Sequence, residues 1–190
     1  MTFYTWGTHI MFKHDFRDFI LVFLSIAQLV INIFAVSYFD TLATSTLFIL
    51  AAVQIILICT NFQCVAHNFI HNTFFKSDFL NGIFSISNTL SLGMPQSTYK
   101  VHHTNHHTYN NDNWDNENPP LDKSSIFYFG KDKQPEHVLA YTFLSYFRLD
   151  LVRLFIMARK RDNALVILET LLLIATVAYL LISHTYAFFC

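Results

Sequence analysis

The chain has 190 residues, of which 53% are hydrophobic and only 13% are charged, compared with about 25% charged residues in typical soluble domains. This composition is typical of a membrane protein and argues against an ordinary soluble domain. The formal net charge of −1 indicates no partner by itself, and we expect no nucleic acid among the partners.

Two long apolar stretches near the start of the chain predict a transmembrane hairpin. Residues 19–39 carry no charge and are dominated by Phe, Ile, Leu and Val, which predicts a first transmembrane helix. About 20 such residues in a helix cross a hydrocarbon core of about 30 Å. A second uncharged stretch begins at Thr41 and predicts a second transmembrane helix over residues 41–66. We expect this helix to continue beyond the lipid to about Asn72.

The remaining segments predict one further transmembrane helix and two elements at the membrane surface. Residues 79–97 are uncharged but rich in Ser, Asn and Thr, which indicates a re-entrant or interfacial segment. Residues 138–161 mix apolar and basic side chains and predict an amphipathic interfacial helix. Residues 164–187 predict a third transmembrane helix. The sequence therefore predicts an all-α, multi-pass integral membrane protein with a single domain over residues 1–190.

The basic residues indicate the orientation of these helices. All 12 Lys and Arg side chains lie at Lys13 and Arg17 or between Lys76 and Arg161. The positive-inside rule then places the N-terminus and the long central segment in the cytosol, with the tip of the hairpin outside.

Two clusters of histidines follow on this cytosolic side. Residues three or four apart share one face of a helix, so His67 and His71 should point the same way. The same holds for His103, His106 and His107, with His102 as an alternative to His103. Neutral imidazole is a good ligand for iron, copper, zinc or nickel, so five converging imidazoles indicate a metal site. The alternative is a structural role, in which the imidazoles bond each other or backbone carbonyls.

Acidic residues that follow the second cluster could support such a site. Metal-bound imidazoles usually donate their second N–H to a carboxylate or a carbonyl. Asp112 and Asp115 are candidates for that role, with a solvated acidic loop as the alternative reading. We expect no catalytic residues beyond the metal ligands.

The two clusters resemble a known family. His67-x-x-x-His71 and His103-x-x-His106-His107 resemble the first two histidine boxes of the integral-membrane fatty acid desaturases, a superfamily that includes hydroxylases and ketolases. The flanks Tyr99-Lys100-Val101-His102-His103 and His107-Thr108-Tyr109-Asn110 are also similar to those of a second box. The resemblance implies a non-haem di-iron centre held by these five histidines and facing the cytosol.

The same resemblance implies an activity and partners. The expected reaction is O₂-dependent introduction of a C=C bond into a fatty acyl lipid. Electrons would come from an external donor, either a ferredoxin-like protein or a b-type cytochrome with its reductase. The family also carries a third histidine box, which these 190 residues lack, so we expect them to be the N-terminal part of a longer enzyme. Three alternatives remain open: a lipid hydroxylase or ketolase, a metal-handling or haem-anchoring membrane protein, and a truncated, non-catalytic metal-binding remnant.

Overall fold

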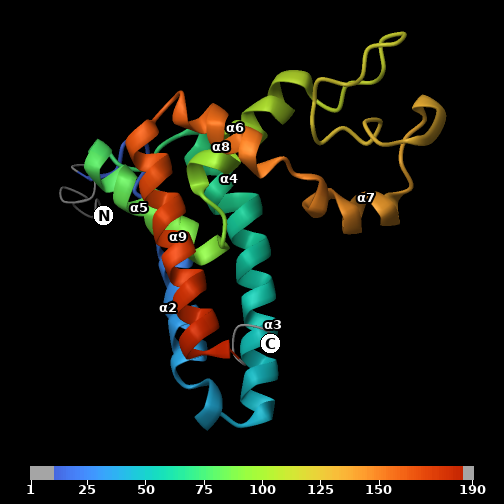
Figure 1. Ribbon diagram of the computed structural model, residues 1–190. Coiled ribbons are helices and arrows are strands. Elements are labelled where there is room, and N and C mark those ends of the chain that lie inside the picture. The colour runs from blue at the N-terminus through green and yellow to red at the C-terminus, as the bar shows by residue number, and fades with distance from the viewer. Residues whose placement is uncertain (1–10, 186–190) are drawn as a thin grey trace, which may run out of the picture. The chain divides into compact units, whose positions relative to one another are not determined.

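The computed structural model describes residues 11–185. Every named element in this part of the chain is a helix (Figure 1), which confirms the predicted all-α class. The contacts divide the chain into two units, residues 1–96 with 167–190, and residues 97–166. Each unit is described in turn.

Three helices are long and apolar enough to cross a membrane. The first is α2 (Asp18–Ser37), which ends two residues before the predicted segment 19–39 does. The second runs from Thr44 to His71 and consists of α3 (Thr44–Thr60), η2 (Asn61–Ala66) and α4 (His67–His71). The third is α9 (Asn163–Ser183). The prediction of three membrane-length helices is confirmed.

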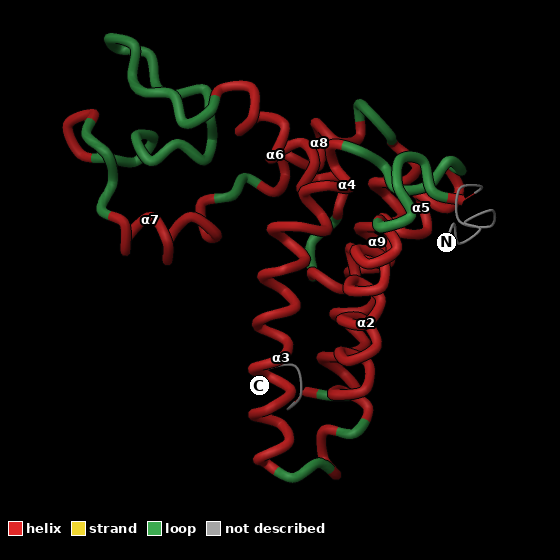
Figure 2. The backbone as a smooth tube through the Cα atoms, turned by 180° about the vertical axis from the view of Figure 1, so that it is seen from behind, coloured by secondary structure: helices red, strands yellow, loops and turns green. Residues whose placement is uncertain are grey.

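In the first unit, α2 and α3 form a helical hairpin joined by the short 3₁₀ turn η1 (Phe39–Thr41), and Figure 2 shows them side by side. The second long helix is not uniformly α-helical, because η2 is a π-helical segment. No pattern in the sequence predicted this segment. In a π-helical turn each backbone hydrogen bond spans five residues instead of four, and such turns are frequent at functional sites.

Residues predicted as a re-entrant or interfacial segment, 79–97, form most of helix α5 (Asp78–Leu92), which packs on α2. Ser77 begins this helix, since its hydroxyl accepts the N–H of Leu80. Gly93 ends it with φ +67°, a left-handed conformation that glycine adopts without a steric penalty. The position of α5 relative to the membrane stays a prediction.

The packing of the first unit combines an aromatic cluster with a buried polar seam. The cluster contains six apolar residues, Phe12, Val65, Phe69, Phe74, Phe75 and Phe84. The seam consists of buried polar residues of α2, η2 and α5 whose side chains bond one another or a backbone carbonyl within the set, namely Ser25, Gln28, Asn61, Asn88 and Ser91. In an apolar environment such groups must find partners within the protein, so the seam fixes the relative position of these helices.

The second unit begins in helix α6 (Gln96–Tyr109), continues through a loop that contains η3 (Lys131–Lys133), and ends with three short helical segments. These are α7 (Val138–Leu144), η4 (Ser145–Arg148) and α8 (Leu151–Arg159). The single helix expected over residues 138–161 is therefore broken. The break lies at Leu149 and Asp150, because Asp150 leaves the helical conformation and caps α8 by accepting the N–H of Arg153.

Candidate metal centre

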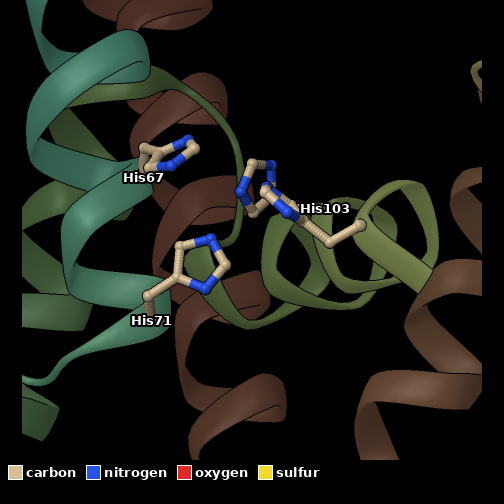
Figure 3. Close-up of side chains that lie close together, drawn as sticks. His67, His71 and His103 are labelled. Carbon is tan, nitrogen blue, oxygen red and sulfur yellow. The ribbon is translucent and has the colours of Figure 1, made fainter. Parts of the chain in front are cut away.

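The first histidine pair lies on α4, directly after the π-helical segment. Phe69 of α4 and Val65 of the preceding segment η2 are buried in the aromatic cluster and anchor this part of the helix. His67 is half-buried and His71 is exposed. Their ring centroids lie 4.9 Å apart, and Figure 3 shows both rings projecting from the same side of the helix. The expected i, i+4 alignment is therefore present, and the two imidazoles can bind one ion together.

The second cluster lies on α6. The ring of His103, which is labelled in Figure 3, lies 4.5 Å from the ring of His107 between centroids, and His107 lies 5.8 Å from His106. His103 is buried and also contacts the ring of Tyr99 at 5.6 Å. Val101 anchors the helix in a small apolar cluster with Leu154. These contacts hold His103 and His107 as a second pair of neighbouring imidazoles.

His106 differs from its neighbours because its ring is bonded to a buried carboxylate. Its Nδ1 lies 2.8 Å from Oδ2 of Asp122 and 3.2 Å from the hydroxyl of Ser124. Asp122 is fully buried and also accepts the backbone N–H of Asn111 and of Ser124, each at 2.8 Å. The Ser124 hydroxyl donates to it at 2.7 Å. The carboxylate thus takes part in four hydrogen bonds, with three residues.

The local environment determines the charge of this carboxylate. Burial alone would raise the pKa of Asp122, but the hydrogen bonds from Ser124, Asn111 and His106 outweigh it and lower that pKa below the ordinary value. Asp122 is therefore ionised at neutral pH and acts only as an acceptor. His102, the alternative ligand, is half-buried, and burial lowers its pKa so that its neutral form is favoured.

The two acidic residues proposed from the sequence lie elsewhere in the same loop. Asp112 accepts the backbone N–H groups of Leu121 and Asp122, at 2.8 Å and 2.9 Å, and so fixes the backbone that carries Asp122. Asp115 is exposed and accepts the side-chain amide of Asn116. Their supporting role at a metal site stays a prediction. Sequence reasoning missed Asp122, which lies 16 residues beyond His106 and is brought back to it only by the fold of the loop.

Among the described residues, two pairs of imidazoles offer nitrogen ligands for a metal ion, His67 with His71 on α4 and His103 with His107 on α6. His106, the fifth histidine expected as a ligand, is not part of this group, and its Nδ1 faces Asp122; its role as a metal ligand stays a prediction. A set of neutral imidazoles suits iron, copper or zinc, and disfavours magnesium or calcium, which prefer oxygen. The residues present therefore fit the iron that the resemblance implies.

Helices long enough to cross a membrane, together with clustered histidines that could hold a metal ion, are typical of helical membrane metalloproteins. The family model described as "Fatty acid desaturase" matches residues 40–190. The chain belongs to the fatty acid desaturase family. Comparisons with curated proteins and with solved structures found no match.

Proposed function

We propose that the protein carries out O₂-dependent desaturation of fatty acyl chains at a di-iron centre. The observation that carries the proposal is the pair of neighbouring imidazoles on α4, with ring centroids 4.9 Å apart, together with a second such pair on α6, 4.5 Å apart. Membership of the fatty acid desaturase family supports a lipid substrate and an oxidative reaction.

The proposed ligands are His67, His71, His103, His106 and His107, with the two pairs serving one centre. Bound iron would supply the activation of O₂. The reaction removes two hydrogens from adjacent acyl carbons, and O₂ leaves as two water molecules after receiving two further electrons and two protons. The electrons come from an external donor of the ferredoxin or b-type cytochrome class. The helices α2, α3 and α9 hold the protein in the bilayer with its histidines facing the cytosol, next to the headgroups of its substrates.

The first test measures iron in the full chain, produced in membranes and purified in detergent. Iron should copurify with the protein, and His71→Ala or His107→Ala should reduce the iron content strongly. His14→Ala is the matched control, because His14 is exposed and lies outside both clusters. Well-folded protein without iron would instead favour the non-catalytic remnant.

The second test identifies the reaction. Membranes that contain the protein, a reductant and a saturated acyl lipid should yield a product that is two hydrogens lighter by mass spectrometry. A product heavier by one oxygen atom would favour the hydroxylase, and a carbonyl product the ketolase. A Soret absorption band in the purified protein would contradict the non-haem centre and favour a haem-anchoring function.

A further inference from the structure

The bond between His106 and Asp122 joins one proposed metal ligand to a carboxylate that the sequence did not indicate. Oδ2 of Asp122 lies 2.8 Å from Nδ1 of His106, and the carboxylate is fully buried. The other neighbour of Nδ1 is the hydroxyl oxygen of Ser124, at 3.2 Å. The position of the protons among these three groups decides which ring nitrogen of His106 is free.

The hydrogen bonds of Ser124 determine those positions. A hydroxyl has one proton to donate, and Ser124 donates it to Oδ1 of Asp122 at 2.7 Å. The oxygen of Ser124 is therefore an acceptor toward His106. Oδ2 of Asp122 is an acceptor as well, because it already accepts the N–H of Asn111, while Oδ1 accepts the N–H and the hydroxyl of Ser124. With two acceptors beside it, Nδ1 of His106 must carry a proton.

A neutral imidazole with its proton on Nδ1 presents its lone pair on Nε2, the nitrogen on the far side of the ring. We infer that Asp122 is a positioning residue for the metal centre: it holds His106 in the Nδ1–H tautomer and so makes Nε2 the nitrogen that binds the metal. Carboxylate–histidine–metal chains of this type orient the ring and raise the basicity of the ligand.

The surrounding loop is built to keep the carboxylate in place. Asp112 accepts the N–H of Leu121 and of Asp122 itself, which fixes the backbone at Asp122. The N–H of Asn111 donates to the same Oδ2 that faces His106, at 2.8 Å. Asn111 has φ +61°, a left-handed conformation that asparagine tolerates better than most residues. Backbone and side chains thus aim Oδ2 at the ring before any metal binds.

This inference rests on the proposed function in one respect, namely that His106 is a metal ligand. The tautomer can be tested separately, in metal-free protein labelled with ¹⁵N in its histidines. At a pH at which His106 is neutral, its ring should carry the proton on Nδ1, as read from the ¹⁵N chemical shifts. A proton on Nε2 in the wild-type protein would overturn the inference, whatever metal the protein binds.

Asp122→Asn is the decisive variant, because it preserves shape but changes the donor pattern. An amide nitrogen in place of Oδ2 would donate to Nδ1 and force the proton onto Nε2, and it would face the N–H of Asn111 as a second donor. The expected result is a change of tautomer in the metal-free protein. The affinity for Fe²⁺, and for Co²⁺ as a spectroscopic probe, should fall by about 10- to 100-fold.

Two controls separate positioning from a loss of structure. Asp132→Asn makes the same chemical change on an exposed side chain of the same loop, and it should leave tautomer and affinity unchanged. Ser124→Ala removes the contacts of the Ser124 hydroxyl with His106 and with Asp122. Asp122 remains an acceptor, so the Nδ1–H tautomer of His106 should persist. If Ser124→Ala weakens metal binding as much as Asp122→Asn while neither changes the tautomer, Asp122 has only a structural role. If the wild-type protein binds no metal but shows the Nδ1–H tautomer, the proposed function fails while the assignment of the tautomer stands.

Discussion

Asn88 occupies the centre of the buried seam, and its replacement by alanine should destabilise the first unit. Its Oδ1 accepts the hydroxyl of Ser25 on α2 at 2.8 Å, and its Nδ2 donates to Oε1 of Gln96 at 2.9 Å. Asn88 and Ser25 are completely buried, and Gln96 is 2% exposed. The alanine variant therefore breaks two hydrogen bonds in a place that water does not reach.

The loss of stability depends on whether each former partner of Asn88 can form another hydrogen bond. The hydroxyl of Ser25 can turn to a carbonyl of its own helix, as serine in helices often does. The side-chain oxygen of Gln96 has no such alternative, because its amide nitrogen already points to the carbonyl of Ala66. Leaving a buried acceptor unpaired costs about 1–3 kcal/mol. We expect Asn88→Ala to lower the free energy of unfolding by about 2 kcal/mol, which corresponds to about a 30-fold change in the unfolding equilibrium constant.

The assay is reversible unfolding of the detergent-solubilised protein with a denaturing detergent, followed by far-ultraviolet circular dichroism. Asn32→Ala is the matched control. Its amide donates to the carbonyl oxygen of Ser91 over a long 3.4 Å, and that oxygen also accepts Gln28 at 2.9 Å, so no group is left unpaired. This control should cost less than about 0.5 kcal/mol. Equal losses in the two variants would refute the reasoning from buried partners.

Two further predictions use the same protein. Gly93→Ala should lower the free energy of unfolding by about 1–2 kcal/mol, because alanine is strained at φ +67°. Gly82→Ala, in the middle of α5, should raise it by up to about 1 kcal/mol, because alanine is the better helix former. An added Cβ meets open space at both positions, so backbone conformation alone separates the two variants. The same unfolding titration compares them, and a loss of equal size in both would contradict the prediction. Burial, with the charges of Asp122 and Glu136, raises the pKa of Tyr141 above its ordinary value of 10.0. Because the folded-state pKa is the higher one, the stabilisation by this phenol is complete below pH 10.0 and is lost as the pH rises through the raised pKa. Tyr141→Phe should abolish that alkaline dependence of unfolding, and an ultraviolet titration of the phenolate should show its late ionisation in the native protein only.

The membrane-length helices were predictable from the sequence because their signal is local and additive. A long run of apolar residues favours a membrane-length helix whatever surrounds it, so the segments 19–39, 41–66 and 164–187 lie within a few residues of the helices observed. The π-helical segment had no local signal in the sequence, and its first residue, Asn61, bonds Gln28, which is 33 residues away on another helix. The break before α8 had a local signal in Asp150, a good capping residue, but the amphipathic pattern on both sides of it favoured one helix.

The candidate site, too, was predictable from the sequence only in part. The spacing of the histidines predicts which rings share a helix face, because helix geometry alone fixes that relation. The pairs His67–His71 and His103–His107 are indeed neighbours. The partner of His106 had no such signal, because it is brought to His106 by a loop. Three asparagines of this loop have positive φ, namely Asn110, Asn111 and Asn116. Asp112 and Asp115 were nearer in sequence, yet the carboxylate that reaches the ring is Asp122.

Asn88 of the buried seam is linked through Gln96 to the starts of α4 and α6, the two helices that carry the histidines. Its replacement should therefore affect metal binding as well as stability. Gln96, the first residue of α6, accepts the amide of Asn88 and donates to the carbonyl of Ala66 at 3.5 Å. Ala66 directly precedes His67. The buried side chain of Gln96 therefore contacts the residue before the first histidine pair, and Gln96 is also the first residue of α6, which carries the second pair. If the metal needs both pairs, Asn88→Ala should weaken Fe²⁺ binding at temperatures where the protein is still folded, and Asn32→Ala should not. Unchanged affinity in a destabilised Asn88→Ala protein would show that the metal itself, rather than the seam, holds the ligands in register.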